Sequence, residues 1–370
     1  MKEFLMSGTI LPVVKVHLPD RARLMTALEN VLYSGMIGEG EAVYEFEHRF
    51  AEQFGLSNVL AMASGTAALH VALLECGVQP GDEVVTTSMT AEPTNTTILQ
   101  VGAIPVFADV DPNTGNLDPV SVEAAITEKT RAILIVHYAG YPVPLAEIRA
   151  IADRKGVALI EDCAHALGAR YGDAPIGTVG DAAIFSFQAI KHMTTVDGGM
   201  LVLRDPTRLR SARKLRWFGL EKGVPRTEVD ITQAGYKYNM NNVTATIGLT
   251  QLDVIQPAIA RHIDNGRFFD AELSNISGLS VVAIEAGSEP SYWLYTLLAD
   301  DSDAVERCMA GIGVTASKLH RPNHFHSVFA PYRRELPGLD IFYRRLVHIP
   351  CGWWVGDDDR ERIVTALRKG

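Results

Sequence analysis

The chain has 370 residues, of which 47% are hydrophobic and 21% charged, and its net charge is −10. These values are typical of a folded globular protein with a large domain and a smaller one attached, and they exclude a disordered chain. The acidic balance, without any block of Lys and Arg to neutralise phosphates, argues against a nucleic-acid partner.

The cysteine content and the hydropathy of the chain indicate the cellular compartment in which the protein is expected. The cysteines are Cys76, Cys163, Cys308 and Cys351. No two of them form a C-x-x-C pair, so neither a zinc site nor a disulfide framework is predicted and a reducing, cytoplasmic setting is expected. Residues 1–10 lack the pattern of a secretory signal, and no apolar run is long enough to span a bilayer. We expect no membrane association.

The first predicted elements are two helices joined by a glycine-rich loop. Residues 21–32 are expected to form a helix capped by Asp20, and residues 42–54 form the second. The loop between them, residues 34–40, is either a plain linker or part of a site.

From residue 58 onward, short β-branched runs alternate with helical patterns. This alternation predicts an α/β fold with a mostly parallel sheet covered by helices on both faces. The expected strands are residues 59–63, 83–87, 105–108, 132–136, 158–161, 182–187 and 200–203.

Beyond Leu203 the alternation stops. The pattern predicts a helix over residues 208–218, an exposed connection over 221–231, and one long amphipathic helix from Asn242 to about Ala260. Shorter mixed segments follow at 280–284, 293–298 and 341–349, before a final helix at 357–367. We therefore expect a large domain in residues 1–255 and a smaller α+β domain in residues 256–370.

One lysine follows directly on an apolar strand. Residues 182–187 lead into a short connection that carries Lys191, and paired threonines and glycines then turn the chain into the next strand. Burial disfavours the ammonium form, so a lysine held here can present a neutral amine that condenses with an aldehyde. The alternative is a surface lysine that follows a core strand.

Small residues open the helix after the first strand. Ser64, Gly65 and Thr66 would turn free backbone N–H groups and the Thr66 hydroxyl toward a bound anion, and the helix dipole favours a negative charge there. A phosphate fits this arrangement. The alternative is an ordinary helix cap made by Ser64.

An aspartate stands at the carboxyl end of another strand. Asp162 follows residues 158–161, where ligands gather in open α/β sheets, and His165 comes three residues later. A buried aspartate stays ionised only when a cation or several donors meet it, and a protonated ring nitrogen would do so. The alternative is a cap for a helix over residues 163–167.

Four separated stretches carry these residues in one order. They are residues 65–69, 161–168, 185–199 and 235–239. Together they resemble the DegT/DnrJ/EryC1/StrS sugar aminotransferases, and the similarity runs from about Gly35 to Gly370. The resemblance implies the fold-type I architecture of aspartate aminotransferase, a homodimer with active sites at the subunit interface, and pyridoxal 5'-phosphate (PLP) as cofactor.

The resemblance assigns roles to individual residues of this sequence according to their positions in the matching motifs. Lys191 would form the Schiff base with PLP, Asp162 would pair with the pyridine nitrogen, and His165 would lie by the ring and its 3-hydroxyl. The phosphate would be held by Gly65, Thr66 and Ser186. A lysine at this position also excludes the dehydratases of the family, which carry histidine there.

Three positions depart from the family pattern. Ala91 stands where many relatives have an aromatic residue stacked on the pyridine ring, so a looser ring pocket is expected. Lys237 replaces asparagine in a motif that in relatives reaches the neighbouring subunit's cofactor, where a lysine would meet phosphate as a point charge. His192 replaces a common asparagine.

Matching loops imply a substrate site. Its residues would be Met36, Glu39, Trp217, His320 and Arg321. For each of them the alternative is an ordinary surface or core position. His324 and His326 have the look of a metal pair but lack further ligands, and the family uses no metal.

The resemblance implies an aminotransferase that moves an amino group from glutamate or glutamine to a nucleotide-linked keto-sugar by a ping-pong reaction. Asp162 would keep the pyridine nitrogen protonated, while Lys191 would carry the transferred proton. Two alternatives remain: transamination of a free keto-cyclitol, which the same residues would serve, and a catalytically silent regulator that binds the cofactor or a sugar.

Overall fold

The structure is a computed structural model that describes residues 10–369. Residues 1–9 and 370, the outermost residues of the two expected domains, lie outside the described residues.

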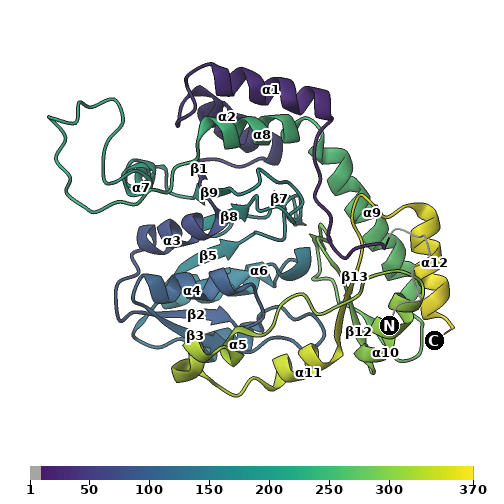
Figure 1. Ribbon diagram of the computed structural model, residues 1–370. Coiled ribbons are helices and arrows are strands. Elements are labelled where there is room, and N and C mark those ends of the chain that lie inside the picture. Colours follow the sequence, from purple (N-terminus) through teal and green to yellow (C-terminus); the bar gives the residue numbers. More distant parts are fainter. Residues whose placement is uncertain (1–9, 370) are drawn as a thin grey trace.

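A seven-stranded sheet forms the centre of the molecule (Figure 1). Its strands, in the order β1-β9-β8-β5-β4-β2-β3, are β1 (Val59–Met62), β9 (Gly199–Leu203), β8 (Ala182–Ser186), β5 (Ala158–Asp162), β4 (Thr130–Val136), β2 (Glu83–Thr87) and β3 (Ile104–Ala108). Only β9 within this sheet runs antiparallel to its neighbours. The predicted α/β fold with a mostly parallel sheet is therefore confirmed.

Both faces of the sheet are buried, because successive strand residues point to opposite sides. Val59 and Ala61 of β1 belong to one apolar cluster, whereas Leu60 and Met62 belong to another. Helices cover each face and supply the other half of each cluster. The first face is covered by α2 (Glu41–Phe54), α5 (Pro119–Ala125), α6 (Leu145–Lys155) and α8 (Asn242–Leu252), and the second by α3 (Gly65–Glu75), α4 (Glu92–Gln100) and α7 (Leu209–Arg216).

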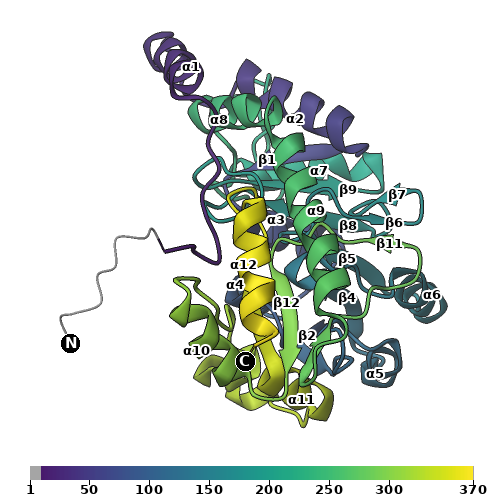
Figure 2. The ribbon, with the colours of Figure 1, turned by 90° about the vertical axis from the view of Figure 1, so that its right-hand side faces the viewer.

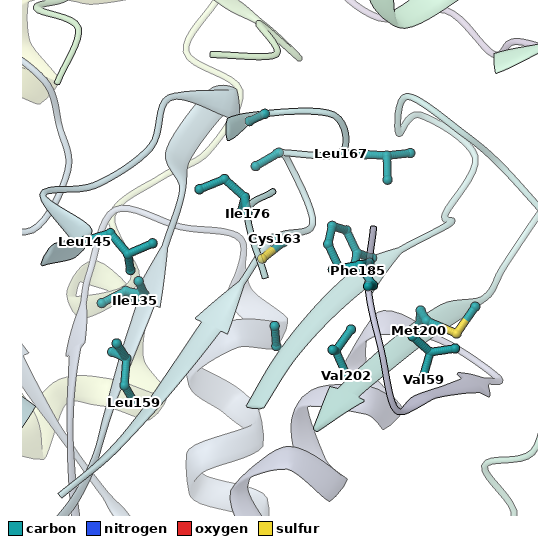
Figure 3. Packing of buried hydrophobic residues seen from close by; sticks show 14 of the residues in the cluster. Val59, Ile135, Leu145, Leu159, Cys163, Leu167, Ile176, Phe185, Met200 and Val202 are labelled. Carbon is teal, nitrogen blue, oxygen red and sulfur yellow. The ribbon is translucent and has the colours of Figure 1, made fainter. Parts of the chain in front are cut away.

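The first cluster can be followed in Figure 3. Leu159, Phe185 and Val202 point from three strands toward the same side as Val59, and Leu145 of α6 meets them there. These continuous apolar strand residues are the reason that the sequence pattern located the strands well.

The C-terminal part builds a second core around a small antiparallel sheet. Its strands, in the order β10-β12-β13, are β10 (Leu279–Val281), β12 (Tyr295–Ala299) and β13 (Leu346–Ile349). The helices around it are α9 (Ile255–Leu273), α10 (Ser302–Gly311), α11 (Pro337–Arg345) and α12 (Asp357–Leu367). In Figure 2, α9 and α12 stand side by side.

The N-terminal segment packs against this C-terminal part. Leu11 pairs in parallel with Val314, and the Trp354 indole N–H donates to the carbonyl of Pro12 at 2.9 Å. Helix α1 (Arg21–Tyr33) then lies against α8 at the top of Figure 1. The domain boundary at residue 255 stays a prediction, although α9 does begin there.

The minor elements connect these parts. A third sheet, in the order β11-β6-β7, contains β11 (Ser288–Glu289), β6 (Arg170–Tyr171) and β7 (Ala174–Pro175). Short 3-10 helices occupy Tyr138–Gly140, Pro206–Arg208, Asn323–Phe325 and Ser327–Tyr332.

Two element predictions were wrong. The single helix expected from Asn242 is two helices, because Pro257 has no N–H to donate and is tolerated only in the first turn of a new helix, here the third residue of α9. Residues 341–349 are also divided, because Pro337 opens α11 and the chain becomes strand β13 only at Leu346.

Across residues 10–369, we find no helix that combines the length and the apolar character needed to cross a bilayer.

Candidate active site

A cavity of about 300 Å³ opens at the carboxyl ends of β5 and β8. Parallel α/β sheets gather ligands at this edge because the strand ends leave a crevice between neighbouring loops. Among the predicted site residues, its walls include Gly65, Thr66, Ala91, Asp162, His165, Ser186, Lys191 and His320. Residues from five separate segments of the chain thus meet in one place.

Lys191 lies in the short connection after β8, as predicted. Its backbone N–H donates to the carbonyl of Gln188 at 3.0 Å, and its side chain is partly buried at the cavity. Burial lowers the pKa of Lys191 to about 7, while the charge of Asp162 opposes this shift. An amine with this pKa is neutral in a large fraction of molecules near neutral pH, so it is a ready nucleophile.

Asp162 ends β5 with its carboxylate buried against the same cavity. Its Oδ2 accepts a hydrogen bond from the Thr94 hydroxyl at 2.9 Å, and its Oδ1 accepts one from the Ala164 N–H at 3.1 Å. Burial raises the pKa of Asp162, whereas these hydrogen bonds and the Lys191 charge oppose the rise. Residues 163–167 form turns, so the alternative of a helix cap is wrong.

The side chain of Glu161, the preceding residue, lies on the opposite side of the strand. Its carboxylate accepts hydrogen bonds from His137 at 3.1 Å and from the N–H groups of Gly177, Val179 and Gly180. Burial by itself would raise the pKa of Glu161, but His137 and the backbone donors outweigh it and lower the pKa. Although His137, Glu161 and Cys163 lie close enough to share a metal ion, four donors already occupy the carboxylate.

The start of α3 forms the far wall of the cavity. Ser64 caps the helix, since its hydroxyl accepts a hydrogen bond from the Ala67 N–H at 3.0 Å. The N–H groups of Gly65 and Thr66 come too early in the helix to bond a carbonyl within it. The predicted serine cap is therefore confirmed, and it leaves the N–H groups of Gly65 and Thr66 without a partner inside the helix, at the positive end of its dipole. Anion binding by these two groups stays a prediction.

Gly65 is required by a close approach. A Cβ atom at this position would lie 2.9 Å from the Ser186 Cβ and 3.1 Å from the Ser186 hydroxyl oxygen. The absent side chain lets the helix start lie next to Ser186. The two backbone N–H groups of Gly65 and Thr66 and the hydroxyls of Thr66 and Ser186 thus form a cradle of hydrogen-bond donors at one wall of the cavity.

His165 is held as a neutral ring beside the cavity. Burial lowers the pKa of His165 well below its usual range, and the charge of Lys191 adds to the effect. The N–H of Ala139 donates to its Nδ1 at 3.4 Å, so that nitrogen is an acceptor. Its ring stacks on Trp293 with the centroids 4.0 Å apart and on His320 with the centroids 5.4 Å apart.

Trp293 is a contact of this site that the sequence patterns did not indicate. It is 1% exposed, and the Lys191 Nζ lies 4.0 Å from the centroid of its ring. No motif near Lys191 pointed to it, because it arrives from the C-terminal part of the chain just before β12.

The other predicted residues lie outside this cavity. Met36 is 67% exposed, and Arg321 is exposed beside the ring of Phe325. Lys237 donates to the Asn239 side chain at 2.8 Å and sits 3.9 Å from the centroid of Trp217.

Glu39 instead belongs to a second cavity, of about 290 Å³, which Trp217 and Lys222 also line. Its side chain is 2% exposed and pairs with Arg216 at 2.8 Å and with Lys222 at 2.9 Å. The sequence patterns did not indicate that Glu39 is buried in an ion-pair network, and its contact with a substrate stays a prediction.

Comparison with known proteins decides what these residues belong to. The profile of the DegT/DnrJ/EryC1/StrS aminotransferase family matches residues 20–368. The chain belongs to this family.

Three relatives illustrate the likeness. The spore coat polysaccharide biosynthesis protein SpsC of Bacillus subtilis (strain 168) is 32% identical over 355 residues, which cover 91% of each protein. The sugar aminotransferase CalS13 of Micromonospora echinospora is 38% identical, with a TM-score of 0.94 and coverage of 98% of this chain and 100% of CalS13. Spr1654 of Streptococcus pneumoniae, solved in its PLP form, is 25% identical, with a TM-score of 0.88 and coverage of 96% and 98%.

This DegT/DnrJ/EryC1/StrS protein is a PLP-dependent aminotransferase with the fold of the sugar aminotransferases. The cavity suits that cofactor on three counts. Lys191 offers an amine with a pKa of about 7, which is the partner that an aldehyde needs. Asp162 is a buried carboxylate short of a full countercharge, and the Gly65–Ser186 cradle matches a phosphate.

Proposed function

We propose that this aminotransferase moves an amino group from glutamate or glutamine to a nucleotide-linked keto-sugar. The observation that carries the proposal is the meeting of Lys191 and Asp162 in one buried cavity with an anion cradle at its far wall. The similarity to SpsC and to CalS13, whose names place them in polysaccharide biosynthesis and sugar amination, supports a sugar as the acceptor.

Each residue then has a task that its surroundings explain. PLP bound here would supply an electron sink for the bonds at the α-carbon of the amino acid. Lys191 would hold the cofactor through its amine and, once displaced by the donor, would move the proton. Asp162 would keep a proton on the pyridine nitrogen, because a buried carboxylate is stabilised by a cationic partner.

The remaining walls would orient the cofactor. The N–H groups of Gly65 and Thr66 and the Ser186 hydroxyl would bind its phosphate, and neutral His165 would lie by the ring without adding charge. Ala91 leaves space where an aromatic residue would stack. His320, on the same wall as His165, is the predicted substrate residue that reaches this cavity.

We further propose a homodimer in which each subunit completes the other's active site. Helix α1 has no buried residue within one described chain, and nearby Tyr33, Met36 and Ile37 are 87%, 67% and 51% exposed. The connection after α7 projects away from the molecule at the left of Figure 1. Lys237 lies where this connection returns to the molecule, paired with Trp217. Apolar surface of this kind is usually covered by a partner, and a second copy of the chain would bring Lys237 toward a neighbouring cofactor.

The test begins with the two half-reactions. The wild-type protein with PLP should show visible absorbance that bleaches with glutamate or glutamine as one 2-oxo acid is released per site. Lys191→Ala should bind PLP without that absorbance and lose turnover, whereas the exposed control Lys129→Ala should match the wild type. Unchanged turnover in Lys191→Ala would refute the proposed role of Lys191.

The acceptor is tested next with the aminated enzyme. Nucleotide-linked keto-sugars and free keto-cyclitols are offered side by side, and we expect amination of the nucleotide-linked class. Amination of cyclitols alone would replace the proposed substrate. Loss of both half-reactions in a fully folded wild-type protein would favour a silent binding protein.

A further inference from the structure

Trp293 contacts Lys191 in two independent ways. Its indole N–H donates to the carbonyl of Ile190 at 2.9 Å, which fixes the peptide group directly before the lysine. Its ring face lies 4.0 Å from the Lys191 Nζ, well inside the range in which an ammonium group is attracted to an aromatic ring. The His165 ring also stacks on this indole, with the two centroids 4.0 Å apart.

The backbone around Trp293 is shaped to bring it there. Tyr292 adopts a φ of 47° and Ala139, on the facing segment, a φ of 54°, both in the left-handed region that such residues rarely occupy. A Cβ on Gly140 would lie 2.8 Å from the backbone nitrogen of Trp293. The Leu294 N–H donates to the Ala139 carbonyl at 3.2 Å and closes the contact. Strain concentrated at such a contact commonly marks a position with a functional task.

We propose that Trp293 is a positioning residue for Lys191, in which the indole N–H holds the peptide before the lysine and the ring face holds its ammonium group. This inference rests on the proposed role of Lys191 in the amination reaction. A tryptophan that merely filled the core would need only a partner for its N–H, whereas this ring also presents its face to the one ammonium group that lines the cavity.

The proposal predicts how the amine titrates. An aromatic face favours the ammonium form, so it partly offsets the burial that lowers the pKa of Lys191 to about 7. The charge of Asp162 raises the pKa of Lys191, and the charge of Lys191 in turn lowers the pKa of His165, His192 and His320. Asp162 is held by the Thr94 hydroxyl and the Ala164 N–H and not by Trp293, so its charge stays the same when Trp293 is replaced and a shift in the titration reports on the ring.

The experiment measures Lys191 in the cofactor-free protein. The full chain is stripped of PLP, and the rate at which Lys191 is acetylated by limiting acetic anhydride is followed by mass spectrometry between pH 5.5 and 10. Trp293→Leu should lower the pKa of Lys191 by about one unit, a tenfold change in the ratio of ammonium to amine. The matched control is Trp354→Leu, which removes another indole whose N–H is bonded to a carbonyl but whose ring does not face the Lys191 ammonium group, and it should leave the pKa unchanged.

A second variant tests the hydrogen bond and covers the case in which Trp293→Leu does not fold. Trp293→Phe keeps a ring face and loses the N–H, so its Lys191 pKa should stay within a few tenths of the wild type. Its capture of PLP, followed by visible absorbance, should slow about fivefold to tenfold because the peptide of Ile190 is no longer fixed. An unchanged or raised pKa in Trp293→Leu, or capture by Trp293→Phe at the wild-type rate, would overturn the corresponding half of the proposal.

The outcomes separate this inference from the proposed function. If Lys191→Ala retains the visible absorbance of bound PLP, the proposed role of Lys191 fails whatever Trp293 does. If Lys191→Ala loses it and the Trp293 variants behave as the wild type, only the positioning role of Trp293 is wrong.

Discussion

Replacing Lys191 with methionine should make the pH dependence of folding stability visible at a single side chain. In the folded cofactor-free protein, burial lowers the pKa of Lys191 from 10.5 to about 7. Between these values the unfolded chain binds more protons at this position than the folded chain does. Stability of the wild type must therefore rise with pH in this window, and Lys191→Met must lack that contribution.

The size of the effect follows from the two pKa values. At pH 7 about half of the folded molecules carry the proton, whereas nearly all unfolded ones do. Integrating the difference in bound protons from pH 7 to pH 9.5 gives roughly 3 kcal/mol, at 1.36 kcal/mol per pKa unit. Lys191→Met should accordingly be more stable than the wild type at pH 7 and should lose most of this advantage by pH 9.5.

Urea unfolding at several pH values measures the difference in unfolding free energy between Lys191→Met and the wild type. Other titrating groups are present in both proteins, so the difference in unfolding free energy isolates Lys191. Repeating the pair in an Asp162→Asn background removes the one carboxylate coupled to it, and the exposed control Lys129→Met should show a flat difference. A gap between Lys191→Met and the wild type that stays constant from pH 7 to pH 9.5 would show that the amine is not desolvated and would remove the basis for its reactivity.

Two further changes test the cradle and the ion pairs. Gly65→Ala places a Cβ 2.9 Å from that of Ser186 and should weaken PLP binding about tenfold or more, measured by equilibrium dialysis, with the fold intact. The control Gly311→Ala, whose Cβ would meet nothing within 4 Å, should bind PLP as the wild type does. Equal affinities in the two variants would refute the role of the cradle. Arg216→Met leaves Glu47 without its ion-pair partner and Glu39 with Lys222 alone, and it should cost about 3–5 kcal/mol in urea unfolding. Exposed Arg210→Met should cost under about 1 kcal/mol, and similar losses in the two variants would contradict the burial argument.

Local patterns located most of the sheet. Strand β2 and helix α12 have the bounds that the sequence predicts, because an apolar run and an acidic first turn are local signals. The break before α9 was missed because hydrophobic periodicity continues across it and only Pro257 marks the new start. Strand β13 was merged with the end of α11 because apolar residues stand on both sides of Arg344 and Arg345, and no glycine or proline separates the two elements.

The site residues also fall into two groups: those that their position in the sequence locates, and those whose contacts only the folded chain reveals. Lys191, Asp162 and Gly65 follow strands or open a helix, so sequence position alone places them at one edge of the sheet. Trp293 and the burial of Glu39 depend on partners far away in the chain, Lys191 for the one and Arg216 for the other. Residue spacing carries no record of such contacts, so only the folded chain reveals them.

The two adjacent carboxylates at the end of β5 lie on opposite sides of the strand and have different partners. Asp162 faces the cavity, while Glu161 is anchored by His137 and by the backbone of residues 177–180 on the reverse side. Any loosening of that anchor would swing the end of the strand and carry the cavity carboxylate with it. A scan for inactivating mutations should thus score Glu161 among the active-site positions, although it never touches the ligand.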